Sequence, residues 1–234
     1  MTVTTIYPDT EAESSPTTMD AMVRRTGDDV VWDTIHGNTD ATLSRSGNAG
    51  EGVRIQSSAT SGQWQPIVRL IFGFDATGGG GGGADVPSAD VISDIKFKVV
   101  GRSKADEIGS QSIGLDLAGP ASNTTVADGD YNGFSGVAQA TSIALSSGSV
   151  TEDSSTYTVF TMNATGISNF EKDGVTFYGL RIDADLIDEV PGSYGTAEVA
   201  DFSPAMVDTG LGADKRPKVE VTHAVGFTPK AIMF

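Results

Sequence analysis

The chain has 234 residues and no cysteine, and its 31 acidic and 15 basic residues give a formal net charge of -16. This excess of acidic residues leaves no basic surface that would bind nucleic acid, and it opposes binding to an anionic membrane surface. The lack of cysteine excludes disulfides and thiolate metal sites, and the length suits one large all-β domain with a core of its own.

The N-terminal stretch MTVTTIYPDT lacks the basic patch and apolar segment of a signal peptide. No apolar run approaches the roughly 20 residues that a membrane span needs. We therefore expect synthesis in a cytoplasm and no export by the usual secretory route.

Segments with alternating apolar and polar residues follow one another along the chain, a pattern typical of half-buried antiparallel strands. Ile95, Phe97 and Val99 share one face of such a segment, whereas Asp94 and two lysines point the other way. The predicted strands are Arg69–Asp75, Val91–Gly101, Ile113–Leu117, Tyr157–Asn163, Val175–Leu186 and Pro217–Val225.

Helical patterns are scarce. Asn163 is placed to cap a short turn in which Ile167 and Phe170 share one face. The six glycines of Gly78–Gly83 predict a long flexible hairpin loop between two strands. Many strands, glycine-rich turns and few helices predict an all-β fold, an antiparallel β-sandwich or jelly roll with one or two short helical turns.

No shift in composition marks a boundary between two large domains. We expect residues 32–225 to form the jelly-roll β-sandwich and residues 1–31 to form an N-terminal strand or arm that packs on it. Residues 226–234, GFTPKAIMF, form an apolar tail on an acidic protein. Such a tail is expected to dock on a neighbouring subunit through Ile232, Met233 and Phe234.

Motifs for catalysis are missing from the sequence. Of the two histidines, His36 lies in a polar, turn-like stretch, and His223 alternates with Val221 and Val225, which favours a structural role. Neither belongs to a metal motif, and the glycine run lacks the lysine and the hydroxyl residue of a phosphate loop. A carboxylate pair of the glycosidase type stays open, because such a pair is defined in space.

The stretch DGDYNG begins like a calcium loop. Asp128, Asp130 and Asn132 would supply oxygens at positions one, three and five, and Gly133 would supply the sharp turn at position six. The twelfth position holds the uncharged Gln139 in place of a bidentate glutamate. The alternatives are an ordinary Asp/Asn/Gly turn and a weak calcium site. No other cofactor is expected.

Aromatic side chains give a second candidate site, since exposed rings on a β-sandwich can stack on sugars. Trp32, Trp64 and Tyr194 are the candidates for a glycan site, with Tyr131 and Tyr178 as further aromatic residues. Packing in the core is the alternative for each of them.

Five segments between Trp64 and His223 together carry a wider pattern, and the match extends from about Trp32 to His223, nearly the whole chain. They are WQPIVRLIFGFD, VPSADVISDIKFKVVG, PASNTTVADGDYNGFSG, YTVFTMNATGISNFEKDGVTFYGLRID and RPKVEVTH. In order and spacing they resemble a family of single-domain proteins from tailed-phage genomes. That family is similar in turn to DNRLRE-type jelly rolls, which are β-sandwiches like carbohydrate-binding modules.

The resemblance implies a structural role for the pair Asp130–Tyr131, with the aspartate capping the turn and the tyrosine packing beneath it. This sequence departs from the family in two places. The loop after Phe74 and Asp75 is longer than the family's short turn, and the tail after Val225 is additional.

The resemblance also implies a non-enzymatic structural protein of the virion, released from the cell by lysis. We expect a capsid decoration or head-fibre protein that contacts other virion proteins and forms a homo-oligomer, a dimer or trimer. One alternative is a tail-tip or fibre adhesin that binds a host glycan, and a weaker one is an enzyme that degrades polysaccharide. The absence of a heptad-containing shaft and of a second domain favours decoration over adhesion.

Overall fold

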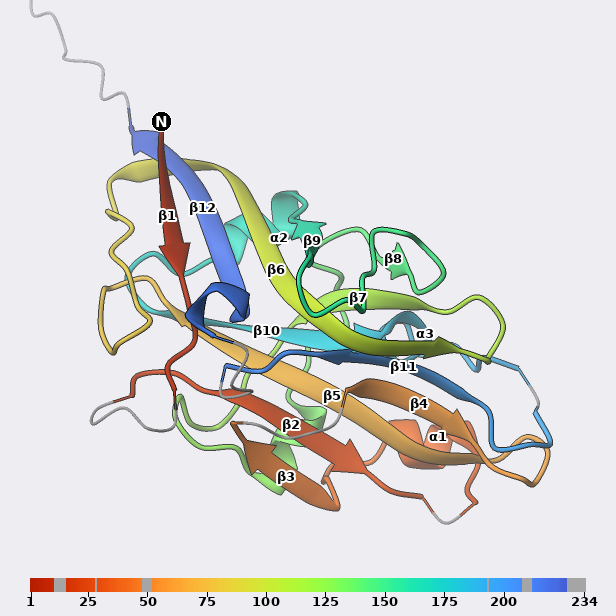
Figure 1. Ribbon diagram of the computed structural model, residues 1–234. Helices are drawn as coiled ribbons and strands as arrows, with labels where there is room; N and C mark the ends of the chain where they lie inside the picture. Colours follow the sequence, from red (N-terminus) through yellow and green to blue (C-terminus); the bar gives the residue numbers. More distant parts are fainter. Residues whose placement is uncertain (11–15, 28, 48–51, 193, 208–211, 227–234) are drawn as a thin grey trace, which may run out of the picture.

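The alternating segments of the sequence are strands in the computed structural model, which describes residues 1–10, 16–27, 29–47, 52–192, 194–207 and 212–226. These residues form an all-β, antiparallel sandwich of 12 strands with a few short helical turns (Figure 1). The strands are β1 Thr2–Ile6, β2 Asp20–Arg25, β3 Leu43–Ser46, β4 Val53–Ser57, β5 Trp64–Asp75, β6 Asp90–Asp106, β7 Ser112–Leu117, β8 Ile143–Ala144, β9 Tyr157–Thr161, β10 Val175–Ile182, β11 Val199–Pro204 and β12 Lys218–Val225. The helices are α1 Trp32–His36, α2 Ala164–Ser168 and α3 Asp183–Leu186, and the 3-10 turns are η1 Asp128–Asn132 and η2 Ala213–Lys215.

Two layers face each other across the core. The small layer contains β1, β12, the first part of β6, and β9. The large layer is built around β5, which pairs with β2, β4 and β10, while β7 and β8 extend it beyond β10 and β3 beyond β2. The last part of β6 pairs with β11, which in turn pairs with β4. The long strand β6 therefore joins the two layers.

Aromatic residues fill the space between the layers. The side chain of Phe97 on β6 is fully buried and lies 5.4 Å, centroid to centroid, from Phe72 and 5.8 Å from Phe74 on β5. It also contacts Tyr178 on β10 and Phe160 on β9. Each buried side chain of this size contributes about 1.5–3 kcal/mol relative to an exposed one, so this cluster anchors the small layer on the large one.

The N-terminal segment is integrated into both layers. Strand β1 pairs with β12 in the small layer, with Thr2 opposite His223, and β2 pairs with β5 in the large layer. The structure also confirms the cap of α2, because the Asn163 side-chain oxygen accepts a hydrogen bond of 2.9 Å from the Gly166 backbone N–H.

Two expectations need correction. The strand predicted for Val175–Leu186 ends at Ile182, and its last four residues form α3. The glycine loop Gly78–Gly83 does not close a hairpin, because it leads from β5 in the large layer to β6, whose first part lies in the small layer. The loop is held in place, since Gly82 donates a backbone hydrogen bond of 2.7 Å to the carboxylate of Asp9 and accepts one of 2.9 Å from Tyr7.

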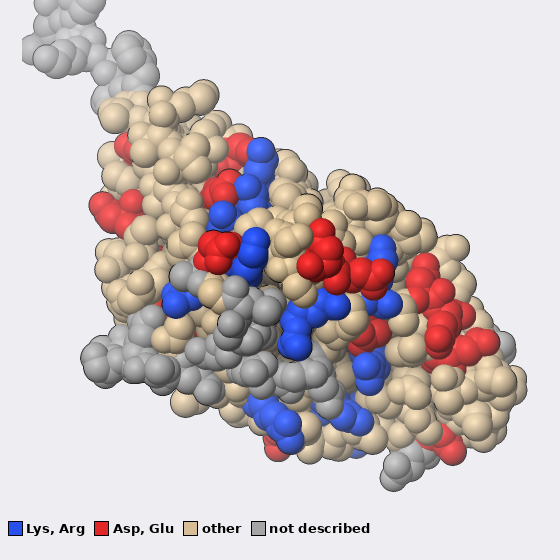
Figure 2. Space-filling view, in the orientation of Figure 1, with Lys and Arg blue, Asp and Glu red and all other residues tan. Residues whose placement is uncertain are grey.

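Charged side chains of both signs are interspersed on the face that Figure 2 shows. On the outer face of the small layer, for example, Glu220 accepts from Lys98 at 2.6 Å and lies 3.1 Å from Lys218. None of the helices in the described parts of the chain combines the length and the apolar character of a membrane span.

The outer face of the large layer carries the polar residues of the candidate site. Arg69 on β5, Arg181 on β10 and Asp116 on β7 alternate with the core-facing residues of their strands and so point away from the core. The connection between β7 and β8, together with α1 and α3, covers this face, and all three side chains are buried.

Candidate functional site

A cleft of about 440 Å³ opens on the outer face of the large layer. This volume lies in the range of small-ligand sites. The residues that line it come from the end of α1, β5, the β7–β8 connection, β10, and the end of α3 with the segment after it: His36, Gly37, Arg69, Asn132, Phe134, Ser135, Gly136, Arg181, Leu186, Ile187 and Asp188.

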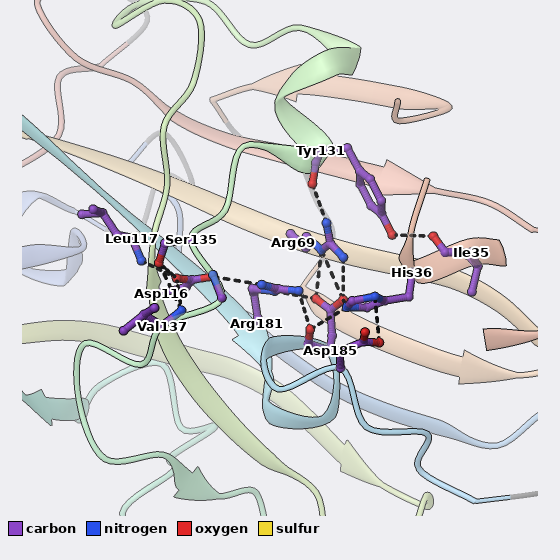
Figure 3. A network of polar contacts seen from close by, with 12 residues as sticks. Ile35, His36, Arg69, Asp116, Leu117, Tyr131, Ser135, Val137, Arg181 and Asp185 are labelled. Atoms are coloured by element: carbon purple, nitrogen blue, oxygen red, sulfur yellow. Dashed lines mark hydrogen bonds and ion pairs between the residues drawn. The ribbon is translucent and has the colours of Figure 1, made fainter. Parts of the chain in front are cut away.

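The floor of the cleft is a network of ion pairs centred on Asp185 (Figure 3). Arg69 donates from Nε to Asp185 Oδ2 at 2.9 Å and from Nη2 to Oδ1 at 2.7 Å, a bidentate arrangement. Its Nη1 donates to the backbone carbonyl of Tyr131. Arg69 thus connects β5 to α3 and to η1.

Arg181 completes the network from the neighbouring strand. Its Nε donates to Asp185 Oδ2 at 2.7 Å, its Nη1 donates to Asp116 Oδ2 at 2.9 Å, and its Nη2 donates to the Asp185 carbonyl. Asp116 also accepts hydrogen bonds from the hydroxyl of Ser135 at 2.5 Å and from the backbone N–H of Gly136 at 3.1 Å. These bonds fix the β7–β8 connection onto the sheet.

The charges of the four side chains balance. Burial by itself would raise the pKa of Asp185, but Arg181 and Arg69 outweigh burial and hold the pKa of this carboxyl below its usual value. Burial would likewise lower the pKa of Arg181, and Asp185 and Asp116 reverse this and raise it. Asp185 and Arg181 are therefore charged at neutral pH, and pairing within the network compensates the cost of burying its side chains.

Two aromatic rings pack on the guanidinium groups. The Arg69 guanidinium carbon lies 4.0 Å from the centre of the Tyr131 ring, and the Arg181 carbon lies 5.3 Å from that of Phe134. Both distances are typical of cation–π contacts. The hydroxyl of Tyr131 donates to the carbonyl of Ile35 at 3.1 Å, and burial raises the pKa of Tyr131.

His36 and Asp188 form one rim of the cleft. The two residues interact at 2.9 Å through His36 Nδ1, and His36 Nε2 lies 2.9 Å from the carbonyl oxygen of Asp185. Asp188 also accepts from Trp32 Nε1 at 3.1 Å, and its side chain is 64% exposed. Among the residues that line the cleft, Asp188 is the only carboxylate.

The residues predicted as a calcium loop form the turn η1. Both carboxylate oxygens of Asp130 accept backbone hydrogen bonds, from Ala121 at 2.9 Å and from Ala127 at 2.8 Å, and Tyr131 is fully buried. This is the capping and packing arrangement expected for that pair. Asp128 accepts from the Ser44 hydroxyl at 2.9 Å, and Asn132 lines the cleft. Within the described residues no group of three or more His, Cys, Asp or Glu side chains is placed to hold a metal ion.

The three aromatic residues predicted as a glycan site do lie together. Trp64 makes edge contacts with Trp32 at 5.2 Å and with Tyr194 at 6.2 Å. However, Trp32 and Trp64 are only 3% and 1% exposed, so their ring faces belong to the core. The cluster adjoins the cleft, because Trp32 also stacks on His36 at 5.5 Å.

His223 has a structural role, as its place on an apolar strand face predicts. It is 3% exposed, lies 2.7 Å from Asp90 on β6 through Nδ1, and lies 2.9 Å from the hydroxyl of Thr4 on β1 through Nε2. It therefore ties three strands of the small layer together. The predicted assembly residues Ile232, Met233 and Phe234 lie outside the described residues.

Sequence reasoning missed the ion network, although the sequence contains a signal for it. Arg69 interrupts a strand whose other residues are almost all buried, and Arg181 and Asp185 stand four positions apart in a similarly apolar stretch. Charged residues at such positions are rarely buried without a partner. Scans against protein-family models, curated proteins and solved structures find no match to this chain.

Proposed function

We propose that this chain is a non-enzymatic structural protein of a tailed-phage virion, most closely a capsid decoration or head-fibre protein. The observation that carries the proposal is that the buried charged groups at the floor of the cleft bind one another and the surrounding loops, which is a structural use of these groups. The Asp185 carboxylate accepts hydrogen bonds from two arginines, and the Asp116 carboxylate accepts them from one arginine and from Ser135 and Gly136. Together these bonds hold the loops onto the sheet. The residue pattern that resembles tailed-phage proteins supports a location on the virion.

The chemistry of the cleft supports a structural role over an enzymatic one. A glycosidase needs two carboxyl groups beside its substrate, one of them with a raised pKa. The cleft is lined by a single carboxylate, Asp188, and the pKa of Asp185 beneath it is lowered. A carboxyl with a lowered pKa is ionised at neutral pH and cannot donate a proton.

A tail-tip or fibre adhesin is the second candidate function. It is favoured by the cleft itself, which combines the Phe134 ring with polar groups from His36, Asn132, Ser135 and Asp188. An uncharged sugar is recognised by such a mixture of an aromatic face and hydrogen-bonding groups. The cleft, rather than the buried Trp32 and Trp64, is where an adhesin of this fold would hold a glycan.

Immunogold electron microscopy of intact particles, with antibody raised against the pure chain, tests the proposal. Gold scattered over the head is the expected result. Gold confined to the tail end would replace decoration with adhesion and direct a glycan array to the cleft. No gold on any particle would overturn the virion role, and antibody absorbed beforehand with the pure chain is the control.

A further inference from the structure

Strand β1 forms an unprotected edge of the small layer. Among the described residues it pairs with β12 alone. Its sequence, TVTTI, consists of five β-branched residues and contains no charge and no proline. Natural edge strands usually carry charged residues, prolines or bulges that prevent pairing with another chain. The edge of β1 has none of these and is therefore suited to accept a further strand.

Exposed apolar side chains gather where β1 begins. Val3 on β1 is 59% exposed, and Met1 is 94% exposed. Val91 on β6 and Val225 on β12 are 62% and 85% exposed, and the pairing of β12 with both strands brings them to the same end of the layer. Figure 1 shows the N-terminus and the end of β12 side by side there. Exposed apolar side chains that gather in one place mark an interaction site.

The segment FTPKAIMF, residues 227–234, follows from this same end of β12. Fully extended, eight residues reach about 26 Å, whereas the five residues of β1 span about 17 Å. Residues 230–234, KAIMF, have no proline and match β1 in length. Neither β1 nor this segment contains an acidic residue, although the chain as a whole carries a net charge of -16. Contact between them avoids the repulsion that two copies otherwise exert on each other.

The geometry directs this segment to another copy of the chain. Strand β12 runs antiparallel to β1 and already occupies its inner edge. To reach the free edge of its own β1, the chain would have to cross over Met1 and return parallel to β1. Parallel neighbours require a crossover of about a dozen residues or more, and only residues 226–229 lie between the end of β12 and residues 230–234.

We propose that residues 227–234 of one copy add as a strand to the free edge of β1 in a second copy. The inference rests on the proposed structural role and identifies the surface that receives the tail. Backbone hydrogen bonds would provide the affinity, and the exposed Val3 would provide apolar contact for Ile232 or Phe234. The contact is heterologous, because tail and edge are different surfaces, so it closes into a ring or continues as a chain.

Two half-blocked chains test the proposal. The receiver-only chain lacks residues 227–234, and the donor-only chain carries Val3→Lys, which puts a charge on the edge. We expect each to be monomeric by native mass spectrometry and their mixture to form a 1:1 complex, whereas the full chain assembles alone. No complex on mixing, or full assembly by either half-blocked chain, would overturn the proposal.

A labelled peptide FTPKAIMF provides a second measurement, which does not depend on the folding of the Val3 variant. It should bind the receiver-only chain, and Val3→Lys in that chain should weaken binding by roughly tenfold or more. The matched control is Val159→Lys on β9, the other edge of the small layer, which should leave binding unchanged. Equal loss in both variants, or no binding at all, would contradict β1 as the receiver. If immunogold labels the particles but the two half-blocked chains form no complex, only this inference is contradicted. If the chains form a complex but no particle is labelled, only the virion role is contradicted.

Discussion

At the scale of single residues, the ion network explains how polar loops are fixed to an apolar sheet. Asp185 accepts hydrogen bonds from two arginines on different strands. Each arginine also donates to another segment, Arg69 to η1 and Arg181 to Asp116 on β7. A hydrophobic side chain at any of these positions would also be buried, but its contacts are not directional and would not hold the covering segments in one fixed place. The network therefore specifies where η1 and α3 sit on the sheet.

Replacing Asp185 by asparagine should lower the free energy of unfolding by about 3–5 kcal/mol, because it leaves two buried arginines without their shared partner. Arg69→Met and the double variant complete a thermodynamic cycle, measured by urea unfolding, whose coupling energy should lie at about 1–3 kcal/mol. Asp173→Asn, at an exposed position, is the control and should change stability by no more than about 0.5 kcal/mol. Strictly additive effects of the two variants would show that the pair does not act as a unit.

The same carboxyl should make stability depend on pH. The pKa of Asp185 is lowered in the folded chain, where the arginines outweigh burial. An unfolded chain binds the proton at about pH 4, so acid favours the unfolded state. The stabilisation is complete above that pH and is lost as the pH falls towards the folded pKa. Between about pH 6 and about pH 3, the wild type should lose more stability than Asp185→Asn. A parallel loss in both proteins would assign the acid sensitivity to other carboxylates.

At the scale of elements, strand β6 depends on one glycine where it passes from the small layer to the large one. Gly101 is the first residue of β6 that pairs with β11, and the β11 register shifts beside it. A Cβ at this position would lie 1.8 Å from the backbone carbonyl oxygen of Thr151. Backbone cannot move aside as a side-chain tip can, so only glycine fits there.

Gly101→Ala should therefore destabilise the fold by about 1–3 kcal/mol, the usual cost of overpacking. Thermal unfolding followed by circular dichroism measures the effect. Gly148→Ala is the matched control, because no atom lies within 4 Å of a Cβ built there, and it should shift stability by at most about 0.5 kcal/mol. Equal midpoints for the two variants would contradict the tight contact at Gly101.

Alternation predicted those strands that bury one face and expose the other, such as β6 and β12. It failed where both faces are covered. In β10 the alternating pattern continues through Asp183–Leu186, yet these residues turn into α3, which brings Asp185 back to Arg181. Here the chain gives up strand pairing and gains ion pairs with residues distant in the sequence. The alternation of apolar and polar residues carries no information about such tertiary contacts.

At the scale of the whole molecule, the fold class followed from the sequence and the candidate site did not. Arg69 and Asp185 are 116 positions apart, and Arg181 and Asp116 are 65 apart. The positions of these charged residues in apolar segments are a signal that the sequence analysis missed, and only the packing of the layers decides which arginine meets which aspartate. The hairpin predicted at the glycine loop failed for the same reason, since pairing between layers is not encoded locally.

Assembly of whole molecules should tolerate salt. Copies with a net charge of -16 repel one another, and added salt screens this repulsion, with a Debye length of about 10 Å at 0.1 M and about 3 Å at 1 M. Contact through backbone hydrogen bonds and apolar side chains is not weakened by screening. Raising the salt from about 0.1 M to about 1 M should therefore leave the proposed oligomer intact or tighten it, as measured by sedimentation velocity. If the proposed virion role is right, the same change in salt should not release the protein from the particle. Matched low-salt and high-salt runs of the chain without residues 227–234 control for non-specific salting-out, which would affect both chains. Dissociation at high salt would instead show that ion pairs hold the copies together.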